Sequence, residues 1–575
     1  MSAPPRETVD ALFLSYYEDI DRWHNDHAPG TPTGSPARYD PPGSQAEHSF
    51  QHRTARQSAS IDGELYDLSR FLSRAAYGTT AEYRRYDGFT TTHLSGAYYD
   101  SLAKRHGFDV RHINHASRVD VLALAERFAP RYLLVSTTFM VEPAITLDCL
   151  QHLRRAFPGV PIVLGGLILV EMQKSVPEAA FRRYLASFGA DAYVISAQGE
   201  EAFLKLLQHD GPLSDVDLPS TWVRDGRSVR PCDAVERGLA MDDNFVRWDE
   251  LDPRSLYHTV HTRTARSCAF ICSFCSYFSN QGPLVLEQPA TLERELEHLK
   301  RAGHVRSLIF TDDTFNVPAT RFKELCRVLA KYDFEWYSFF RAQFADDETV
   351  GLMADAGCRG VFMGVESLDD RVLKNMQKAS TLKAYTRGIQ RLLEAGIHMH
   401  ANFIIGFPGD VPENTPRFLS WLDDLGVDFF CATPWYCSPA TPIHEQRDKY
   451  GVVGEYYRWK HDTMDVHQAM DLEESLIAGG SHSIFMTELG GRSFWSELLL
   501  MSNGFERDEL RHTIATFNRM CGSDRTSAEL ARDADYQKLV SILKKRPLPD
   551  APGSELYRTP EASAAVNASS LSVDA

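Results

Sequence analysis

Six strand-like segments, each followed by a helical pattern, succeed one another over residues 259–445, and this repetition restricts the fold more than any other feature. A strand–helix repeat predicts a parallel sheet covered by helices. Because a complete (β/α) barrel has eight repeats, we predict an α/β fold with a partial (β/α)6 barrel. The segments are "HTVHTRTAR", "RSLIFTDDTF", "FEWYSFFRAQ", "CRGVFMGVES", "HMHANFIIGF" and "DFFCATPWYCS".

A second alternation of strands and helices precedes the barrel, over residues 1–212. Runs that are apolar throughout are typical of parallel strands buried on both faces. The pattern predicts a doubly wound domain with a Pro-, Gly- and Ser-rich loop at about 24–60. The expected strands are "VDALFLSYY", "FDVRHIN", "RYLLVSTTFM", "VPIVLGG" and "ADAYVIS".

The remaining segments complete the expected organisation. Polar residues 213–258 are expected to link the two α/β domains. Residues 446–550, which include "GEYYRWKHDTMD" and "RSFWSELLLMSNGF", predict a helical C-terminal region over the barrel. The small, polar residues 551–575 predict a disordered tail.

Charge and hydropathy narrow the functional classes. The formal net charge of the 575 residues is −17, which argues against non-specific nucleic-acid binding because that binding needs a basic surface. Apolar runs are shorter than a transmembrane helix requires, and "MSAPPRETVD" lacks signal-peptide character. We therefore expect a cytoplasmic protein with neither a nucleic-acid nor a membrane partner.

Three cysteines, Cys268, Cys272 and Cys275, lie within eight residues directly after the first barrel strand. They could be buried unreactive thiols, or ligands of a structural zinc ion with no clear fourth ligand nearby. They could also hold a [4Fe–4S] cluster and leave one iron open for chemistry. The position favours the third interpretation, because (β/α) barrels carry their active sites on the loops that follow the strands.

The motif C-x3-C-x-aromatic-C, with Phe274 at the aromatic position, resembles that of the radical S-adenosylmethionine (SAM) superfamily. The resemblance implies that the open iron binds the amino and carboxylate groups of SAM. One electron from the cluster would then release a 5′-deoxyadenosyl radical. An external reductant of the flavodoxin or ferredoxin type is implied as a partner.

Polar residues at the ends of later barrel strands match the SAM-binding positions of this family. The resemblance places Asp312 and Asp313 near the amino group and Arg341 near the carboxylate. Helix capping is the alternative role of the two aspartates. The strand "ANFIIGFPGD" would lie near adenine. The implied SAM contacts are Phe274, Asp312, Asp313, Arg341, Glu366, Ser367 and Asn402.

A doubly wound domain before such a barrel is similar to the cobalamin-binding radical SAM enzymes, over about residues 9–480. The resemblance implies cobalamin contacts from small or polar residues that follow the strands: Ser136, Thr137, Thr138, Gly165, Gly166, Gln198, Gly199 and Glu200. A Rossmann-like domain kept only for packing is the alternative. The D-x-H-x-x-G motif of classical cobalamin proteins is absent, since Thr91 stands two residues before His93. Packing at a helix start is therefore preferred over cobalt ligation for His93.

The resemblance implies a class B, cobalamin-dependent radical SAM methyltransferase, most similar to the branch that includes the phosphinothricin-pathway P-methyltransferase. The radical would abstract hydrogen from an unactivated carbon or a phosphinate P–H of a small molecule or peptide. Methylcobalamin would then deliver the methyl group. Cyclisation, ring contraction or oxidation without methyl transfer is the alternative. Trp459, His461, Cys431 and Cys437 are further residues that could face substrate, with packing as their other role.

Overall fold

The N-terminal sheet is built around two apolar strands that pair in parallel, β1 (Glu7–Leu14) and β5 (Phe128–Ser136). The computed structural model describes residues 6–18, 57–140, 143–479, 482–486 and 493–550. The strand order is β4-β1-β5-β6-β7-β8-β9. The other parallel strands are β4 (Val110–Ile113), β6 (Ile162–Gly165) and β7 (Ala192–Val194).

Helices cover both faces of this sheet, so the predicted doubly wound α/β class is confirmed. On the face that shares a core with the barrel lie α4 (Leu94–Arg105) and α9 (Glu200–Gln208). On the opposite face lie α5 (Arg118–Arg127), α6 (Pro143–Ala156), α7 (Leu167–Ser175) and α8 (Glu178–Phe188). The direction in which strands are added reverses between β1 and β5, and such a switch point opens a ligand-binding crevice at the carboxyl ends of the strands.

The stretch expected as a linker is partly structured instead. It contributes β8 (Thr221–Asp225) and β9 (Ser228–Pro231), which extend the N-terminal sheet in the antiparallel direction. Residues 213–258 were predicted to be a linker because stretches such as "RDGRSVRP" are polar. This stretch nevertheless forms a hairpin that turns at Gly226, whose φ is 60°.

A parallel sheet forms the partial barrel in the order β10-β13-β14-β15-β16-β17-β20. All six predicted strands are present, and the two-residue β20 (Ile484–Phe485) adds a seventh beside β17. The six are β10 (Thr259–Thr262), β13 (Ser307–Phe310), β14 (Glu335–Phe339), β15 (Cys358–Glu366), β16 (His398–Ile405) and β17 (Phe429–Pro434).

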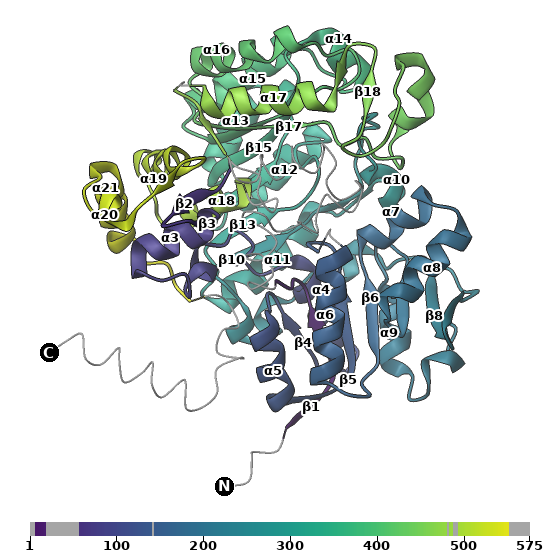
Figure 1. The fold of residues 1–575 in the computed structure, drawn as a ribbon. Coiled ribbons are helices and arrows are strands. Elements are labelled where there is room, and N and C mark those ends of the chain that lie inside the picture. The colour runs from purple at the N-terminus through teal and green to yellow at the C-terminus, as the bar shows by residue number, and fades with distance from the viewer. Residues whose placement is uncertain (1–5, 19–56, 141–142, 480–481, 487–492, 551–575) are drawn as a thin grey trace, which may run out of the picture.

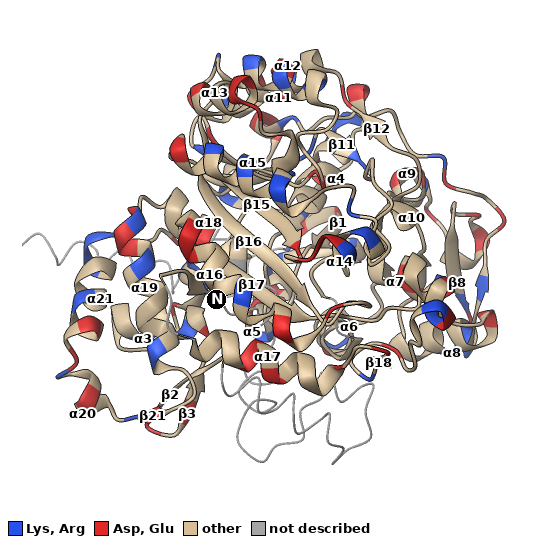
Figure 2. Ribbon diagram, turned by 90° about the horizontal axis from the view of Figure 1, so that it is seen from above, with Lys and Arg blue, Asp and Glu red and all other residues tan. Residues whose placement is uncertain are grey.

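Outer helices cover the barrel strands, with α15, α16 and α17 side by side at one end of Figure 1. Basic and acidic residues are interspersed along α12, whereas the charged residues of α13 are all acidic (Figure 2). None of the helices in the described ranges combines the length and the apolar character needed to cross a bilayer. The outer helices are α11 (Pro289–Ala302), α12 (Ala319–Leu329), α13 (Asp347–Asp355), α14 (Asp370–Asn375), α15 (Leu382–Glu394), α16 (Pro416–Leu425) and α17 (Val466–Ala478).

The inner face of the barrel packs against α18 (Ser493–Ser502) from the C-terminal region. Phe494 and Leu498 share a core with Ile309 and Tyr337, which point opposite to the strand residues that meet the outer helices. Glu497 fixes the helix, since its carboxylate oxygens lie 2.8 Å from Nε2 of His398 and 2.6 Å from Nδ1 of His400.

Residues 57–86 do not belong to the doubly wound domain in which they were expected. They form β2 (Ala59–Ile61), β3 (Glu64–Tyr66), α3 (Leu68–Tyr77) and the short η2 (Tyr83–Tyr86). These elements share a core and the β21-β2-β3 sheet with the C-terminal elements, as the purple and yellow segments of Figure 1 show. The partners are α19 (Arg507–Met520), β21 (Asp524–Arg525), α20 (Ser527–Leu530) and α21 (Ala534–Lys545).

The C-terminal region is less helical than predicted. The stretch "GEYYRWKHDTMD" contains the antiparallel pair β18 (Lys460–His461) and β19 (Met464–Asp465) rather than a helix. Tyr456 with φ 56° and Gly454 with φ 88° interrupt any helical run before it. The expected loop at 24–60 lies outside the described residues except for its last four, and the tail 551–575 lies outside them entirely.

Candidate active site between the two domains

The three motif cysteines lie on the loop between β11 (Ala265–Arg266) and α10 (Tyr277–Gln281), at the carboxyl end of the barrel strands. Two of the three sulfurs accept a hydrogen bond, and the third, that of Cys268, lies beside the hydroxyl of Thr314, which itself donates to the carbonyl of Asp313. The hydroxyl of Thr314 lies 3.4 Å from Cys268, and the backbone N–H of Tyr277 lies 3.4 Å from Cys275. Nη2 of Arg341 donates to Sγ of Cys272 over 3.1 Å. Such donors stabilise sulfur ligands that carry negative charge.

The spacing of these sulfurs does not suit a single metal ion. Zinc binds thiolates at about 2.3 Å, so sulfurs on one ion lie within ~4.6 Å of one another. Among the described residues, the ligand atoms of Glu18, Asp87 and His115 gather within 4.8 Å, but the three motif sulfurs are not such a group. A donor set of three separated thiols fits an iron–sulfur cluster, whose irons spread the ligands apart.

Arg341 is held rigidly beneath the cysteine loop. Its guanidinium carbon lies 3.5 Å from the centre of the Phe270 ring, and Nη1 donates to the carbonyl of Lys378 over 2.7 Å. Its backbone N–H donates to Oδ1 of Asn316. The side chain is 7% exposed, so it presents a fixed, partly desolvated cation to Cys272.

Glu366 and Lys378 form a buried ion pair beside the same loop. Nζ of Lys378 lies 2.7 Å from Oε1 of Glu366, and both side chains are at most 8% exposed. Nζ also lies 5.5 Å from the centre of the Phe274 ring. Glu366 has a φ of 70°, a strained conformation for this residue type and one that is typical of functional sites. The sequence interpretation missed Lys378, Asn316 and Phe270, since their roles depend on contacts across the barrel.

The two neighbouring aspartates have different surroundings. Asp312 is buried and accepts hydrogen bonds from the backbone N–H and the hydroxyl of Thr264, so its carboxylate is engaged in holding the cysteine loop. Asp313 lines the cavity described below and hydrogen-bonds Tyr277. Asp313 itself is exposed, but desolvation by the surrounding protein and then the charge of Asp312 raise the pKa of its carboxyl.

The other predicted SAM contacts lie on neighbouring strand ends. The hydroxyl of Ser367 accepts from the backbone N–H of Asp369. Asn402 points toward the inner face of β16, and its Oδ1 is buried with no hydrogen-bond partner among the described residues. A buried acceptor in this state fits a site that is completed by a ligand donor. Phe274 packs edge-on against Phe407, with ring centres 6.2 Å apart.

A cavity of about 350 Å³ joins the doubly wound domain to the barrel. Its walls on the domain side come from the carboxyl ends of β1, β5, β6 and β7, at the switch point of the sheet. The barrel side includes Arg263, Tyr277, Thr311 and Asp313. All but one of the predicted cobalamin contacts line it: Ser136, Thr138, Gly165, Gly166, Gln198, Gly199 and Glu200.

Two glycines make the domain side of this cavity flat. Gly166 precedes α7 with a φ of 125°, and a Cβ there would lie 2.4 Å from Oγ1 of Thr137. Gly165 has ordinary backbone angles, and its Cβ would meet Val194 at 3.6 Å. Thr137 does not line the cavity, because its hydroxyl donates to the Gly165 carbonyl and thereby fixes the turn. A backbone without side chains is a suitable cradle for a large ligand.

Glu200 borders the cavity, but its carboxylate is engaged at the contact between the two domains. Oε1 accepts from the Tyr98 hydroxyl over 2.6 Å and from Arg266 of the barrel, and Oε2 accepts from the backbone N–H of Leu239. Gln198 spans the same contact, with Nε2 donating to Gln281 over 2.9 Å. These bonds fix the position of the doubly wound domain relative to the cysteine loop.

An aromatic wall closes the barrel side of the cavity. The His261 ring stacks on Trp495 at 4.9 Å and on His93 at 5.5 Å, and Phe339 lies 6.2 Å from Trp495. Burial lowers the pKa of His261 to about 3, so the ring is neutral. Trp495 was not predicted, because it belongs to α18, which lies more than 200 residues after the His261 strand and reaches the site through the barrel interior.

The other residues considered from the sequence take packing roles. His93 precedes α4 and is fully buried, with Nε2 2.7 Å from the Phe89 carbonyl, as expected for helix-start packing. Trp459 is 1% exposed and donates to the Trp435 carbonyl, while its ring stacks on His461 at 5.2 Å. Cys431 and Cys437 are buried.

Comparison with known families supports the barrel assignment. Residues 262–422 match the profile of the radical SAM superfamily. An uncharacterized methyltransferase of Synechocystis sp. is 30% identical over 278 residues, which cover 46% of this chain and 52% of the relative. An anaerobic magnesium-protoporphyrin IX monomethyl ester cyclase of Rubrivivax gelatinosus is 28% identical over 352 residues, covering 56% of this chain and 60% of that protein. The chain thus spans only part of the curated relatives it matches.

The fold extends the similarity beyond the barrel. The radical SAM methyltransferase TsrM from Kitasatospora setae, solved with cobalamin and a [4Fe–4S] cluster bound, aligns with a TM-score of 0.51 and 16% identity. The alignment covers 79% of this chain and 96% of TsrM, so both α/β units share one arrangement with it. The three cysteines, the parallel barrel and the matching profile lead to one conclusion: residues 262–422 of this chain are a radical SAM domain.

Proposed function

We propose that this chain is a cobalamin-dependent radical SAM methyltransferase. One observation supports the proposal most strongly. The same cavity is lined by Gly165 and Gly166 of the doubly wound domain, here called the glycine cradle, and by Asp313 and Tyr277 beside the cysteine loop. A ligand in the cradle and one at the loop would face each other across it. The TsrM similarity supports this arrangement, since that protein was solved with both groups bound.

Cys268, Cys272 and Cys275 would hold the cluster, with Arg341 donating to Cys272. Asp313, Ser367 and Asn402 would contact SAM from neighbouring strand ends, and Phe274 would pack beside it. Asp312 would support the site indirectly, because it accepts a hydrogen bond from Thr264 and so positions the cysteine loop. Glu366 and Lys378 would present a fixed ion pair to the same site.

The domain side would hold cobalamin through Gly165, Gly166 and Gly199, with the hydroxyls of Ser136 and Thr138 beside them. Thr137 would support the turn rather than touch the ligand. Glu200 and Gln198 would hold the two domains together at the edge of the site. The neutral rings of His261 and Trp495 would shield the space between the cofactors from water.

When bound, these groups supply a carbon radical and a methyl donor. The work left to the chain is placement and exclusion of water, and the buried aromatic wall and the two domain-spanning hydrogen bonds perform it. The substrate, a small molecule or a peptide, would enter the same cavity, and an external one-electron reductant would reach the cluster from outside. Cyclisation without methyl transfer is the second candidate function, because the cyclase of Rubrivivax gelatinosus covers 56% of this chain.

Anaerobic reconstitution tests the proposal. Wild-type protein with iron, sulfide, SAM and reductant should show cluster absorption near 400 nm and form 5′-deoxyadenosine. The triple substitution of Cys268, Cys272 and Cys275 by Ala should abolish both, whereas Cys431→Ala should retain them as the matched control. Cluster absorption or deoxyadenosine formation in the triple variant would overturn the assignment.

A further inference from the structure

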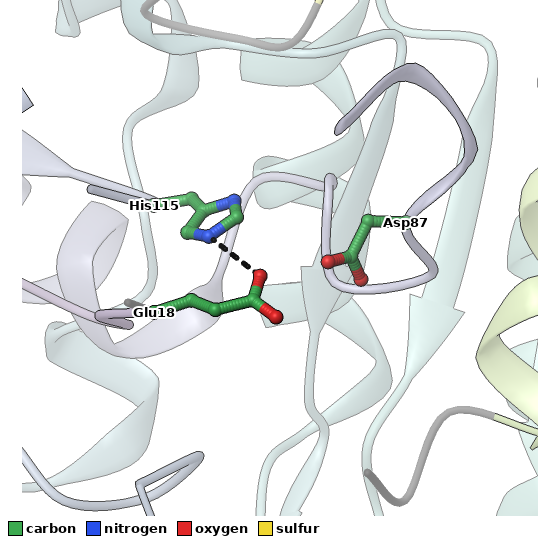
Figure 3. Close-up of side chains that lie close together, drawn as sticks. All are labelled: Glu18, Asp87 and His115. Carbon is green, nitrogen blue, oxygen red and sulfur yellow. Dashed lines mark ion pairs between the residues drawn. The ribbon is translucent and has the colours of Figure 1, made fainter. Parts of the chain in front are cut away.

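A second constellation of metal-binding residues lies in the doubly wound domain, apart from the cysteine loop. Glu18, Asp87 and His115 each offer a ligand atom, and the three atoms lie within 4.8 Å of one another. All three residues are buried, at 5%, 0% and 4% exposure of the whole residue. They come from separate parts of the chain and converge on one point, as Figure 3 shows.

The backbone brings Glu18 and His115 together by continuing the sheet contact past the ends of β1 and β4. The N–H of Ser15 donates to the carbonyl of Ile113, and the N–H of Glu18 donates to that of Ala116. This places Oε2 of Glu18 3.6 Å from Nε2 of His115 (Figure 3). Asp87 follows η2 on the segment that returns to the domain, and it faces the pair from the opposite side.

Neighbouring groups orient these side chains, as the outer contacts of a metal site do. Oε1 of Glu18 lies 3.3 Å from Nη2 of Arg70, which directs Oε2 toward His115. Oδ1 of Asp87 accepts the backbone N–H of Phe89 over 2.9 Å. The His115 ring lies 4.8 Å from the ring of Tyr16.

We propose that Glu18, Asp87 and His115 bind one first-row divalent cation, for which Mn²⁺ is the test ion. One imidazole nitrogen and two carboxylate oxygens form a mixed donor set that suits such cations. Two carboxylates that face each other in a buried space repel, and a dication between them relieves that repulsion. Arg70 pairs with Glu18 and also with Asp67, so its charge is divided between two carboxylates.

The cation would hold separate segments of the doubly wound domain together, and in this sense it would act as a clamp. It would tie the ends of β1 and β4 to the segment that carries Phe89, whose ring lies 5.1 Å from that of Phe139. Phe139 lines the cavity between the two domains. The clamp therefore fixes a wall of that cavity, but binding of the cation does not depend on the radical chemistry proposed above.

Metal analysis of tag-free protein and Mn²⁺ titration after chelator treatment, followed by electron paramagnetic resonance, test this site. Wild-type protein should bind one Mn²⁺ per chain, with a spin-echo modulation from a directly bound imidazole nitrogen. Glu18→Gln, Asp87→Asn and His115→Gln should each weaken binding by about tenfold or more. Asp100→Asn, which removes the buried contact of Asp100 with His112 in the same domain, should bind as wild type.

Cys272→Ala should also retain the Mn²⁺ site, which separates this test from failure of the cluster assignment. Absence of saturable Mn²⁺ binding, or binding without the imidazole modulation in wild-type protein, would overturn the proposal whether or not the variants fold. Equal binding by well-folded His115→Gln would overturn it as well. The cluster would then be an ion-pair network centred on Arg70.

Discussion

Nη2 of Arg341 lies 3.1 Å from Sγ of Cys272, so a buried guanidinium donates to one of the three motif thiols. A positive donor at a ligand sulfur stabilises the reduced, more negative state of an iron–sulfur cluster. Arg341, which lies two residues after the end of β14 (Glu335–Phe339), should therefore influence the reduction potential of the site.

Replacing Arg341 by Gln should lower the reduction potential of the reconstituted cluster by about 60 mV, a tenfold change in the one-electron reduction equilibrium. Arg341→Lys should lower the reduction potential less, because the positive charge remains although the planar guanidinium group is lost. A redox titration followed by electron paramagnetic resonance measures both. Identical potentials in wild type and Arg341→Gln would show that the contact does not tune the cluster.

The two cradle glycines should respond differently to substitution. Gly166→Ala should destabilise the domain by about 1–3 kcal/mol, because its φ of 125° disfavours a side chain and its Cβ would lie 2.8 Å from the backbone N of Thr137. Gly165→Ala should fold normally, since its Cβ meets only Val194 at ordinary contact distance. Thermal unfolding of both variants without cofactors measures this contrast, and equal melting temperatures would contradict it.

Removing only one partner of the Lys378–Glu366 ion pair should lower the free energy of unfolding. Although burial favours the neutral amine, the charge of Glu366 raises the pKa of Lys378, so the amine is charged. Lys378→Met should cost about 3–5 kcal/mol because it leaves a buried carboxylate, and adding Glu366→Gln should recover part of that loss. Unfolding midpoints of the single and double variants check the sign of the coupling. A double variant less stable than Lys378→Met would contradict the account.

Stability should fall as pH drops from 7 to 5. Burial lowers the pKa of His261 to about 3 and that of His93 well below 6.5, while both titrate near 6.5 when unfolded. The unfolded chain therefore gains protons first, and at pH 5 the protein should lose about 2 kcal/mol of stability through His261, with a further loss through His93. His261→Gln should show a shallower decline of melting temperature over this window. An equal decline in wild type and variant would argue against a neutral His261.

Much of the fold follows from local patterns. The apolar strands of both sheets and the loop after β10 were predicted because parallel strands and their carboxyl-end loops leave direct traces in the sequence. The positions of residues 57–86 and α18 were not predicted, since each packs against elements hundreds of residues away. Trp495 was missed for the same reason, whereas Lys378 was missed because its partners Glu366 and Arg341 lie at the ends of other barrel strands. Glu200 and Asp312 were identified without their actual hydrogen-bond partners, Arg266 and Thr264.

The central claim is that one chain holds a cluster on Cys272 and cobalamin against Gly165 at the same time. Iron and cobalt contents of matched preparations, each reconstituted with both cofactors, test it most directly. We predict four iron atoms and one cobalt atom per wild-type chain, loss of iron alone in Cys272→Ala, and loss of cobalt alone in Gly165→Phe. Wild-type protein that takes up no cobalt, or Gly165→Phe that retains the wild-type amount, would contradict the claim.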